Sequence, residues 1–341
     1  MKKHLILFFS VIVSLKGLGQ DIHFSQIFET SLLRNPALGG VFTGDVRVQS
    51  VYRSQWNTIT DAYKTGSLSG EYKIPTGGGN DYLTVGGQIV YDKAGTVNLS
   101  TTQFMPAINF SKSLSSERNM FLSAGLMAGI AQRRIDESKI TTNSQYTGGV
   151  VIPGAATGEH FNRNNYSYFD GIVGLSFNAQ LGENANNNLY LGAAYHHFNK
   201  AKNLGFYSNA NLEMKPKWLA SFGIRNNVND YSFITLQADY SVQDNYTEIV
   251  GGALYSIKLD DPDNAEKIFH IGSYLRWSDA IIPAAKLEIR PLSIGISYDV
   301  NISPLKKASL GRGGFELSLT YQRAVSRSID YTDPSMRCPR F

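Results

Sequence analysis

An alternation of apolar and polar residues with a period of two runs through most of this chain and constrains its fold more than any other feature. The alternation is clearest in residues 231–243, 291–302 and 313–322. In a β-strand, successive side chains point to opposite faces, so a period of two gives one apolar and one polar face. The pattern therefore predicts β-structure in which each strand separates an apolar from a polar environment.

Turn residues divide this pattern into about fourteen predicted strands. An even number of antiparallel strands of roughly ten residues can close into a membrane barrel with no edge exposed to lipid. The sequence therefore predicts an all-β fold, a transmembrane outer-membrane β-barrel formed by residues 44–322. The predicted strands lie near 44–56, 62–74, 81–92, 97–112, 119–133, 166–180, 188–198, 215–226, 231–243, 246–258, 267–278, 281–289, 291–302 and 313–322.

The lengths of the connections support this strand count independently. Connections after even-numbered strands are short, whereas the longest ones, 134–165 and 199–214, follow odd-numbered strands. In outer-membrane barrels the short turns face the periplasm and the long loops face outward. This parity predicts a periplasmic tail at 323–341 and leaves two alternatives for residues 20–43, a periplasmic segment or a plug inside the lumen.

The N-terminus has the features of an export signal. Lys2 and Lys3 precede an apolar run from Leu5 to Leu15 and a small-residue stretch that ends at Gly19. The run is too short to span a bilayer as a helix, so residues 1–19 are predicted to be a signal peptide. Without them, 29 basic and 28 acidic side chains remain, and this balance predicts no nucleic-acid partner.

Residues with catalytic or metal-binding chemistry form no recognisable pattern. The single cysteine, Cys338, has no partner for an intrachain disulfide. His196 and His197 are adjacent, so on a strand they are expected to face opposite sides and not to share a metal ion. No metal, cofactor or catalytic residue is predicted, and the chain is expected not to be an enzyme.

Charged residues of both signs lie on the predicted inward-facing phase of several strands. If the first and last strands meet, these side chains can form a network in the lumen. One interpretation is a structural ion-pair network that fills the interior, and the other is a polar passage or ligand contact. The residues are Arg47, Arg53, Glu71, Lys73, Lys286, Glu288, Arg290, Asp299 and Glu316.

Short sequence motifs near both ends carry a family resemblance. They are Phe24-Ser25-Gln26, Asn35-Pro36-Ala37, Tyr52-Arg53-Ser54-Gln55-Trp56, Tyr298-Asp299-Val300-Asn301, Gly311-Arg312-Gly313-Gly314-Phe315-Glu316 and the ending Cys338-Pro339-Arg340-Phe341. Together they resemble the PorP/SprF family of Bacteroidetes outer-membrane proteins, which is associated with the type IX secretion system and gliding motility.

The resemblance implies a barrel similar to the fatty-acid transporter fold and a non-catalytic role in the export or surface retention of partner proteins. The implied partners are adhesins or other cargo with a C-terminal sorting domain, periplasmic components of the secretion machinery, and membrane lipid. The candidate periplasmic contact is Arg337, Cys338, Pro339, Arg340 and Phe341, although the tail could equally fold into the barrel mouth. The long loops are the candidate cargo-facing surface, and the rival function is a channel for small or hydrophobic solutes.

Overall fold

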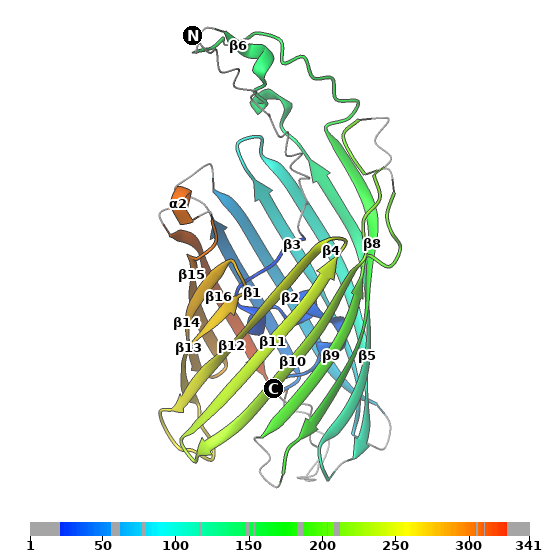
Figure 1. Cartoon of the computed structure of the whole chain (residues 1–341). Coiled ribbons are helices and arrows are strands. Elements are labelled where there is room, and N and C mark those ends of the chain that lie inside the picture. Colours follow the sequence, from blue (N-terminus) through cyan, green and yellow to red (C-terminus); the bar gives the residue numbers. More distant parts are fainter. Residues whose placement is uncertain are drawn as a thin grey trace, which may run out of the picture.

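The chain forms a closed antiparallel β-barrel, with part of the N-terminal region inside it (Figure 1). The structure is a computed structural model that describes residues 21–55, 62–76, 80–115, 117–147, 150–152, 154–182, 187–202, 204–207, 212–304, 306–309 and 311–325. The predicted signal peptide and the candidate contact residues 337–341 lie outside the described residues, as does Trp56.

All fourteen predicted strands are present, and their ends fall within three residues of the predicted ones. The wall strands are β1 (Val46–Gln55), β2 (Tyr63–Thr76), β3 (Asp81–Ala94), β4 (Leu99–Ser115), β5 (Met120–Arg134), β8 (Asn165–Gln180), β9 (Asn188–His196), β10 (Lys217–Asn229), β11 (Ser232–Gln243), β12 (Tyr246–Lys258), β13 (Lys267–Arg276), β14 (Ala280–Ile289), β15 (Leu292–Asn301) and β16 (Arg312–Arg323).

Each strand pairs with its neighbour along the chain, and β1 closes the ring by pairing with β16. The register of this closing pair runs from Val46 opposite Arg323 to Gln55 opposite Gly314. Closure satisfies the backbone hydrogen bonds of both edge strands, which is required in a hydrocarbon environment.

The side chains along the wall are polar inside and apolar outside, the reverse of a water-soluble protein. In β15 the exposed residues are Leu292, Ile294, Ile296, Tyr298 and Val300, and every intervening residue is buried. An exposed belt of this kind is favourable where the surrounding solvent is lipid. The period-two pattern of the sequence therefore corresponds to one face of the wall toward lipid and one toward the lumen.

The two ends of the barrel differ in the length of their connections (Figure 1). One end carries short turns, whereas the other carries the connections 135–164 and 197–216 and the short helix α2 (Lys306–Ser309). The first of these connections holds η3 (Glu137–Lys139), η4 (Asn143–Gln145) and a small hairpin of β6 (Tyr146–Thr147) and β7 (Val150–Val151). We call the end with the long connections the outer end. Within the described chain, no helix combines the length and the apolar character needed to cross a membrane.

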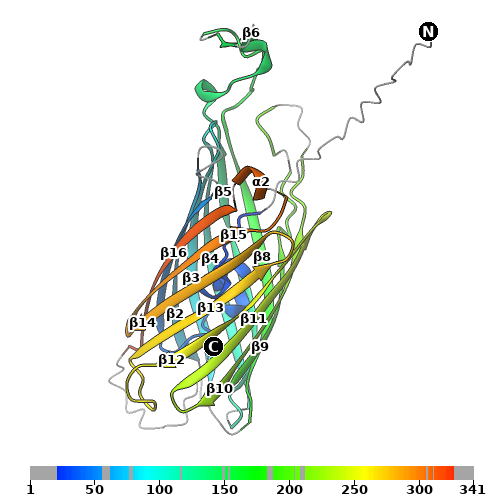
Figure 2. The ribbon, with the colours of Figure 1, turned by 60° about the vertical axis from the view of Figure 1, so that its left-hand side comes forward.

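The N-terminal segment, defined here as Asp21–Gly44, lies within the barrel in both ribbon views (Figures 1 and 2). Asp21 lies beside His197 and Lys217, near the outer ends of β9 and β10. At the other end of the segment, the Gln322 amide donates to the Thr43 carbonyl near the end of β16. The segment therefore runs along the lumen from its outer half to the end with short turns.

Candidate functional site: a charged lumen filled by the N-terminal segment

Short helical turns, with no long helix, give the N-terminal segment its shape. They are η1 (Ile27–Glu29), α1 (Ser31–Arg34) and η2 (Pro36–Leu38). Asn35 caps η2, since its side chain accepts a hydrogen bond from the Ala37 N–H. Pro36 follows at the first helical position, where its missing N–H costs nothing. The motif Asn35-Pro36-Ala37 thus fixes a compact turn in the middle of the lumen.

The segment contacts all fourteen strands of the wall. These contacts come from every side of the wall at different heights, so the segment is held within the lumen and does not line one side only. A cavity remains between the segment and the inner wall, lined by residues that include His23, Phe24, Met105, Met127, Ile172 and Leu219. The wall residues involved include Arg47 (β1), Glu71 (β2), Thr84 (β3), Asn109 (β4), Gly125 (β5), Ser176 (β8), His196 (β9), Lys217 (β10), Asp239 (β11), Glu248 (β12), Arg276 (β13), Lys286 (β14), Asp299 (β15) and Glu316 (β16).

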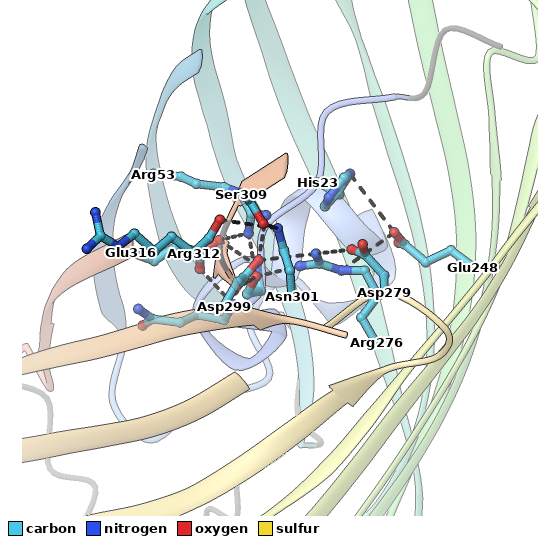
Figure 3. Close-up of polar contacts among 12 residues, drawn as sticks. His23, Arg53, Glu248, Arg276, Asp279, Asp299, Asn301, Ser309, Arg312 and Glu316 are labelled. Atoms are coloured by element: carbon cyan, nitrogen blue, oxygen red, sulfur yellow. Dashed lines mark hydrogen bonds and ion pairs between the residues drawn. The ribbon is translucent and has the colours of Figure 1, made fainter. Parts of the chain in front are cut away.

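Arg53 belongs to a charged cluster inside the barrel, and its side chain is fully buried (Figure 3). Its guanidinium pairs with Asp299 at 2.8 Å and with Glu316. Arg276 reaches the same Asp299 carboxylate at 3.2 Å. Ser25 of the N-terminal segment donates to Asp299 at 2.7 Å, so the cluster joins four wall strands, β1, β13, β15 and β16, to the segment.

A second cluster holds the segment against β1 and β2. Arg47 pairs with Glu71 and donates to the Ser31 hydroxyl at 2.7 Å. The Glu71 carboxylate also accepts the Gly40 N–H at 2.8 Å. Lys73 donates to the Phe42 carbonyl at 2.6 Å, and its ammonium lies 4.4 Å from the centre of the Phe42 ring. Each of these wall charges therefore has a partner on the segment or on a neighbouring strand.

The remaining charges of the predicted set lie on β14 and at its end. Lys286 pairs with Glu29 of the segment. Glu288 lies 3.7 Å from His270 and 2.9 Å from Arg290, whose side chain is half exposed at the short-turn end. Seven of the nine predicted residues are thus in contact with the segment or with its direct wall partners, whereas Glu288 and Arg290 lie apart.

The ion pair between Arg34 and Asp239 was not among the predicted residues. Arg34 binds both oxygens of the Asp239 carboxylate and also donates to the Tyr190 hydroxyl at 2.9 Å. Asp239 lies on the polar phase of β11, so its inward position was readable from the sequence. Arg34 lies in a segment without periodicity, and the 205 residues between the two gave no signal that they meet.

Small residues allow the segment to approach the opposite wall closely. A Cβ atom at Gly125 would lie 2.4 Å from the backbone of Pro36 and Ala37. The Asn35 amide donates to the Leu175 carbonyl at 3.0 Å, and Ser176 donates to the Ala37 carbonyl at 2.7 Å. The glycine leaves room for the turn at Pro36, and the polar groups around it fix its position.

The expectation that His196 and His197 face opposite sides of a strand is wrong. β9 ends at His196, and His197 has φ +58°, which turns its side chain inward as well. Both residues are 3% exposed. His196 lies 3.0 Å from the Arg34 carbonyl, whereas His197 lies between Asp170 and Asp21 at 2.9 and 3.0 Å. Burial opposes protonation of His197, but the two carboxylates prevail and raise its pKa to about 10, so it is a cation.

Among the described residues, no three His, Cys, Asp or Glu side chains are grouped so that they could hold a metal ion. The acidic groups in the lumen accept hydrogen bonds from arginine, lysine or backbone N–H groups instead. This arrangement of paired charges in the lumen can bind a polypeptide segment tightly through buried, charge-assisted hydrogen bonds.

Glu29 gives the docked segment a dependence on pH. Burial alone would raise its pKa, but Lys286 and the hydrogen bonds from Thr320 and Gln49 lower it below the ordinary value of 4.5. A lowered pKa stabilises docking above pH 4.5, and this contribution is lost as the pH falls through the lowered value. We expect Glu29→Gln to be less stable at neutral pH and to change less on acidification. The thermal unfolding midpoint measures both effects.

Exposed Glu137 in the outer connection provides the matched control, since Glu137→Gln removes an acid without touching the lumen. This variant should keep the acid dependence of the parent protein. An equal acid dependence in Glu29→Gln and the parent would show that Glu29 does not contribute.

Comparison with known proteins places these features in a family. A family profile described as "Type IX secretion system membrane protein PorP/SprF" matches residues 17–321. No curated protein sequence matches the chain significantly. The profile match covers the N-terminal segment from Asp21 onward and nearly the whole barrel.

Solved structures share the barrel at low sequence identity. The toluene transporter TbuX of Ralstonia pickettii is 12% identical, with a TM-score of 0.51 over 87% of this chain and 94% of that one. The toluene transporter TodX of P. putida is 10% identical, with a TM-score of 0.50 over 88% and 94%. At such identities the likeness concerns the fold, which is that of an outer-membrane barrel. Given this fold and the match over residues 17–321, the chain is an outer-membrane protein that belongs to the PorP/SprF family of type IX secretion system membrane proteins.

Proposed function

We propose that this protein is a non-catalytic barrel of the type IX secretion and gliding machinery that assists the export or surface retention of cargo bearing a sorting domain, such as adhesins. The observation that carries the proposal is the N-terminal segment, which lies within the lumen and contacts all fourteen wall strands. A lumen occupied by the chain's own segment suits a protein that binds partners at its two ends better than one that passes solutes.

The outer connections are the proposed cargo-facing surface. The 135–164 connection projects beyond the barrel, with the hairpin of β6 and β7 near its tip (Figure 1). Tyr146, Val150 and Ile152 are 56%, 65% and 47% exposed there. These apolar side chains stand clear of the lipid belt and are exposed, and exposed apolar groups of this kind are typical of protein contacts.

The opposite end is the proposed contact with periplasmic components. The last described residue, Val325, follows the end of β16 and donates its N–H to Asp45 at 2.9 Å. The candidate contact residues Arg337, Cys338, Pro339, Arg340 and Phe341 follow further along the chain. Their combination of cations, a rigid proline and an aromatic ring is suited to a protein interface.

In this proposal the charged residues of the lumen hold the segment in place and do not bind a transported solute. Arg53, Asp299 and Glu316 support this role, since each contacts the segment or its direct partner and is fully or almost fully buried. Burial of an unpaired charge is costly, so these three side chains can be buried in the lumen because they pair with one another.

A channel for small or hydrophobic solutes is the second candidate. Its support is the shared fold with TbuX and TodX, both described as toluene transporters. An apolar cluster formed by Met105, Met127, Ile172, Ala194 and Leu219 on the inner wall gives it some further support. Such a channel would require the N-terminal segment to move.

A deletion strain separates the two functions. Cell-surface display of sorting-domain proteins is measured by protease shaving and mass spectrometry after complementation with the full chain or with a chain that ends at Pro334. Loss of display that only the full chain restores supports the export role and a contact within 335–341. Unchanged display together with reduced solute uptake would instead support the channel.

The hairpin offers a narrower prediction. We expect the combined substitution Tyr146→Ser, Val150→Ser and Ile152→Ser to reduce cargo display at the surface while the barrel folds normally. Truncation of a hot-spot side chain costs about 2 kcal/mol or more, which weakens binding by more than about tenfold. Display is measured by protease shaving, and barrel folding by the heat-modifiable band in electrophoresis.

Polar residues of the same connection supply the control. Glu137→Ser with Lys139→Ser changes side chains that are also exposed but not apolar, and display should stay at the parental level. If the apolar triple variant displays cargo as well as the parent, the hairpin is not the cargo surface.

A further inference from the structure

The closure between β1 and β16 is the most demanding pairing in this fold. It joins Val46 to Arg323, whereas every other wall pair joins strands that follow one another in the chain. The entropy lost when a loop closes grows with the number of residues in it, and non-local pairings form slowly. We call the pair of β1 and β16 the seam.

The N-terminal segment binds the inner face of β16 along the seam. Glu316 accepts the backbone N–H groups of Ser25 and Gln26 at 2.6 and 2.8 Å. Two residues further along the strand, Ser318 donates to the Gln26 side chain at 2.7 Å. These contacts occupy successive inward positions of the strand.

A third contact continues the same row. Thr320 donates to the Glu29 carboxylate at 2.6 Å. Glu316, Ser318 and Thr320 have a spacing of two, so all three face the lumen. The segment therefore contacts the last strand at three consecutive inward positions, in the middle of the seam.

The same part of the segment is also bound to β1. The Gln49 amide donates to Glu29 at 3.0 Å, and Arg47 donates to Ser31 at 2.7 Å. These partners are separated by only 20 and 16 residues, so they can form before distant strands arrive. Glu29 thus joins the first strand, the last strand and, through Lys286, the strand β14.

We propose that the N-terminal segment, docked on β1, is the template on which β16 closes the barrel. It presents two backbone N–H groups and the side chains of Gln26 and Glu29 at the height where Glu316, Ser318 and Thr320 must arrive. This role in assembly goes beyond the proposed export function and does not depend on it.

The test follows closure in the full mature chain. In a Cys338→Ser background, Ser50→Cys with Leu319→Cys reports the seam, and Leu236→Cys with Ala253→Cys reports the pair β11 and β12. Both pairs lie directly opposite each other in the register. The chain is refolded from urea into lipid vesicles, and a short thiol cross-linker is added at successive times.

The template variant combines Gln26→Ala with Glu29→Gln, and the control Asn35→Ala removes amide contacts of the same segment to the distant β8 and β9 carbonyls. In the template variant we expect the seam cross-link to form later than in the parent, while the β11–β12 cross-link forms at the parental rate. In the control Asn35→Ala, we expect the delay between the β11–β12 cross-link and the seam cross-link to equal that of the parent. An unchanged seam cross-link in the template variant, or an equal delay in the control, would overturn the proposal. If the double variant forms neither cross-link, Gln26→Ala alone is judged by the same two outcomes.

Discussion

Replacement of Arg53 by methionine is expected to destabilise the barrel by about 3–5 kcal/mol, since it leaves the buried Glu316 carboxylate without its cation. Arg53 is 0% exposed, and it pairs with Asp299 and Glu316, which are 2% and 0% exposed. Arg276 still reaches Asp299 in the variant, but Glu316 keeps only backbone donors. The measurement is equilibrium unfolding in urea of the purified protein in detergent.

An exposed ion pair provides the matched control. Lys112 pairs with Asp81 at 2.7 Å, but its side chain is 59% exposed. Exposed pairs contribute about 0–1 kcal/mol, so Lys112→Met should change the unfolding free energy little. If Arg53→Met is no more destabilising than Lys112→Met, the buried cluster does not hold the segment and wall together.

Gly125→Leu is expected to displace the N-terminal segment and to open the lumen. A Cβ atom at this position already meets the backbone of Pro36 and Ala37 at 2.4 Å, and backbone cannot move aside as a side chain can. Overpacking costs about 1–3 kcal/mol, and withdrawal of the turn from the wall relieves it. Eight-stranded barrels are filled by side chains, whereas those of about 16–18 strands leave an aqueous channel, so fourteen strands without a plug should give a narrow pore.

Conductance in planar bilayers measures this effect. The parent protein should remain closed, and Gly125→Leu should show discrete openings. Gly70→Leu is the control, because a Cβ at Gly70 has no atom within 4 Å. A closed Gly125→Leu protein that folds normally would mean that the segment does not depend on this close approach.

The strands and their order were predictable from the sequence because a barrel wall separates two environments at every residue. Alternation in 291–302, for example, located β15 to within one residue at each end. The parity of connection lengths then fixed which ends of the strands lie together. Both signals are local and repeat many times, so small errors at single strands did not accumulate.

The position of the N-terminal segment was not predictable in the same way. Its turns have no periodicity, and its contacts join residues as far apart as Gln26 and Ser318. A plug and a periplasmic segment were therefore equal alternatives in the sequence. His197 escaped prediction for a related reason, since a single positive φ at the end of β9 reversed the expected side-chain direction.

Several of the described residues that carry the family resemblance lie where the segment meets the wall. Ser25 and Gln26 contact Glu316, Asn35 caps the central turn, and Arg53 pairs with Asp299. These motifs therefore contribute directly to the contacts between the segment and the wall. The physical basis that these motifs share is the docking of the N-terminal segment on the wall, and no single motif reveals it.

Cross-linking in intact cells tests most directly whether the N-terminal segment occupies the lumen. Ala37→Cys and Ser176→Cys are introduced together with Cys338→Ser, since the Ser176 hydroxyl lies 2.7 Å from the Ala37 carbonyl. A docked segment predicts efficient cross-linking by a short thiol reagent in the outer membrane, at a level that Gly125→Leu reduces. Two results together would contradict docking of the segment in the lumen. The double-cysteine protein without Gly125→Leu would form no cross-link, and the thiol introduced in place of Ala37 would react with a bulky hydrophilic reagent.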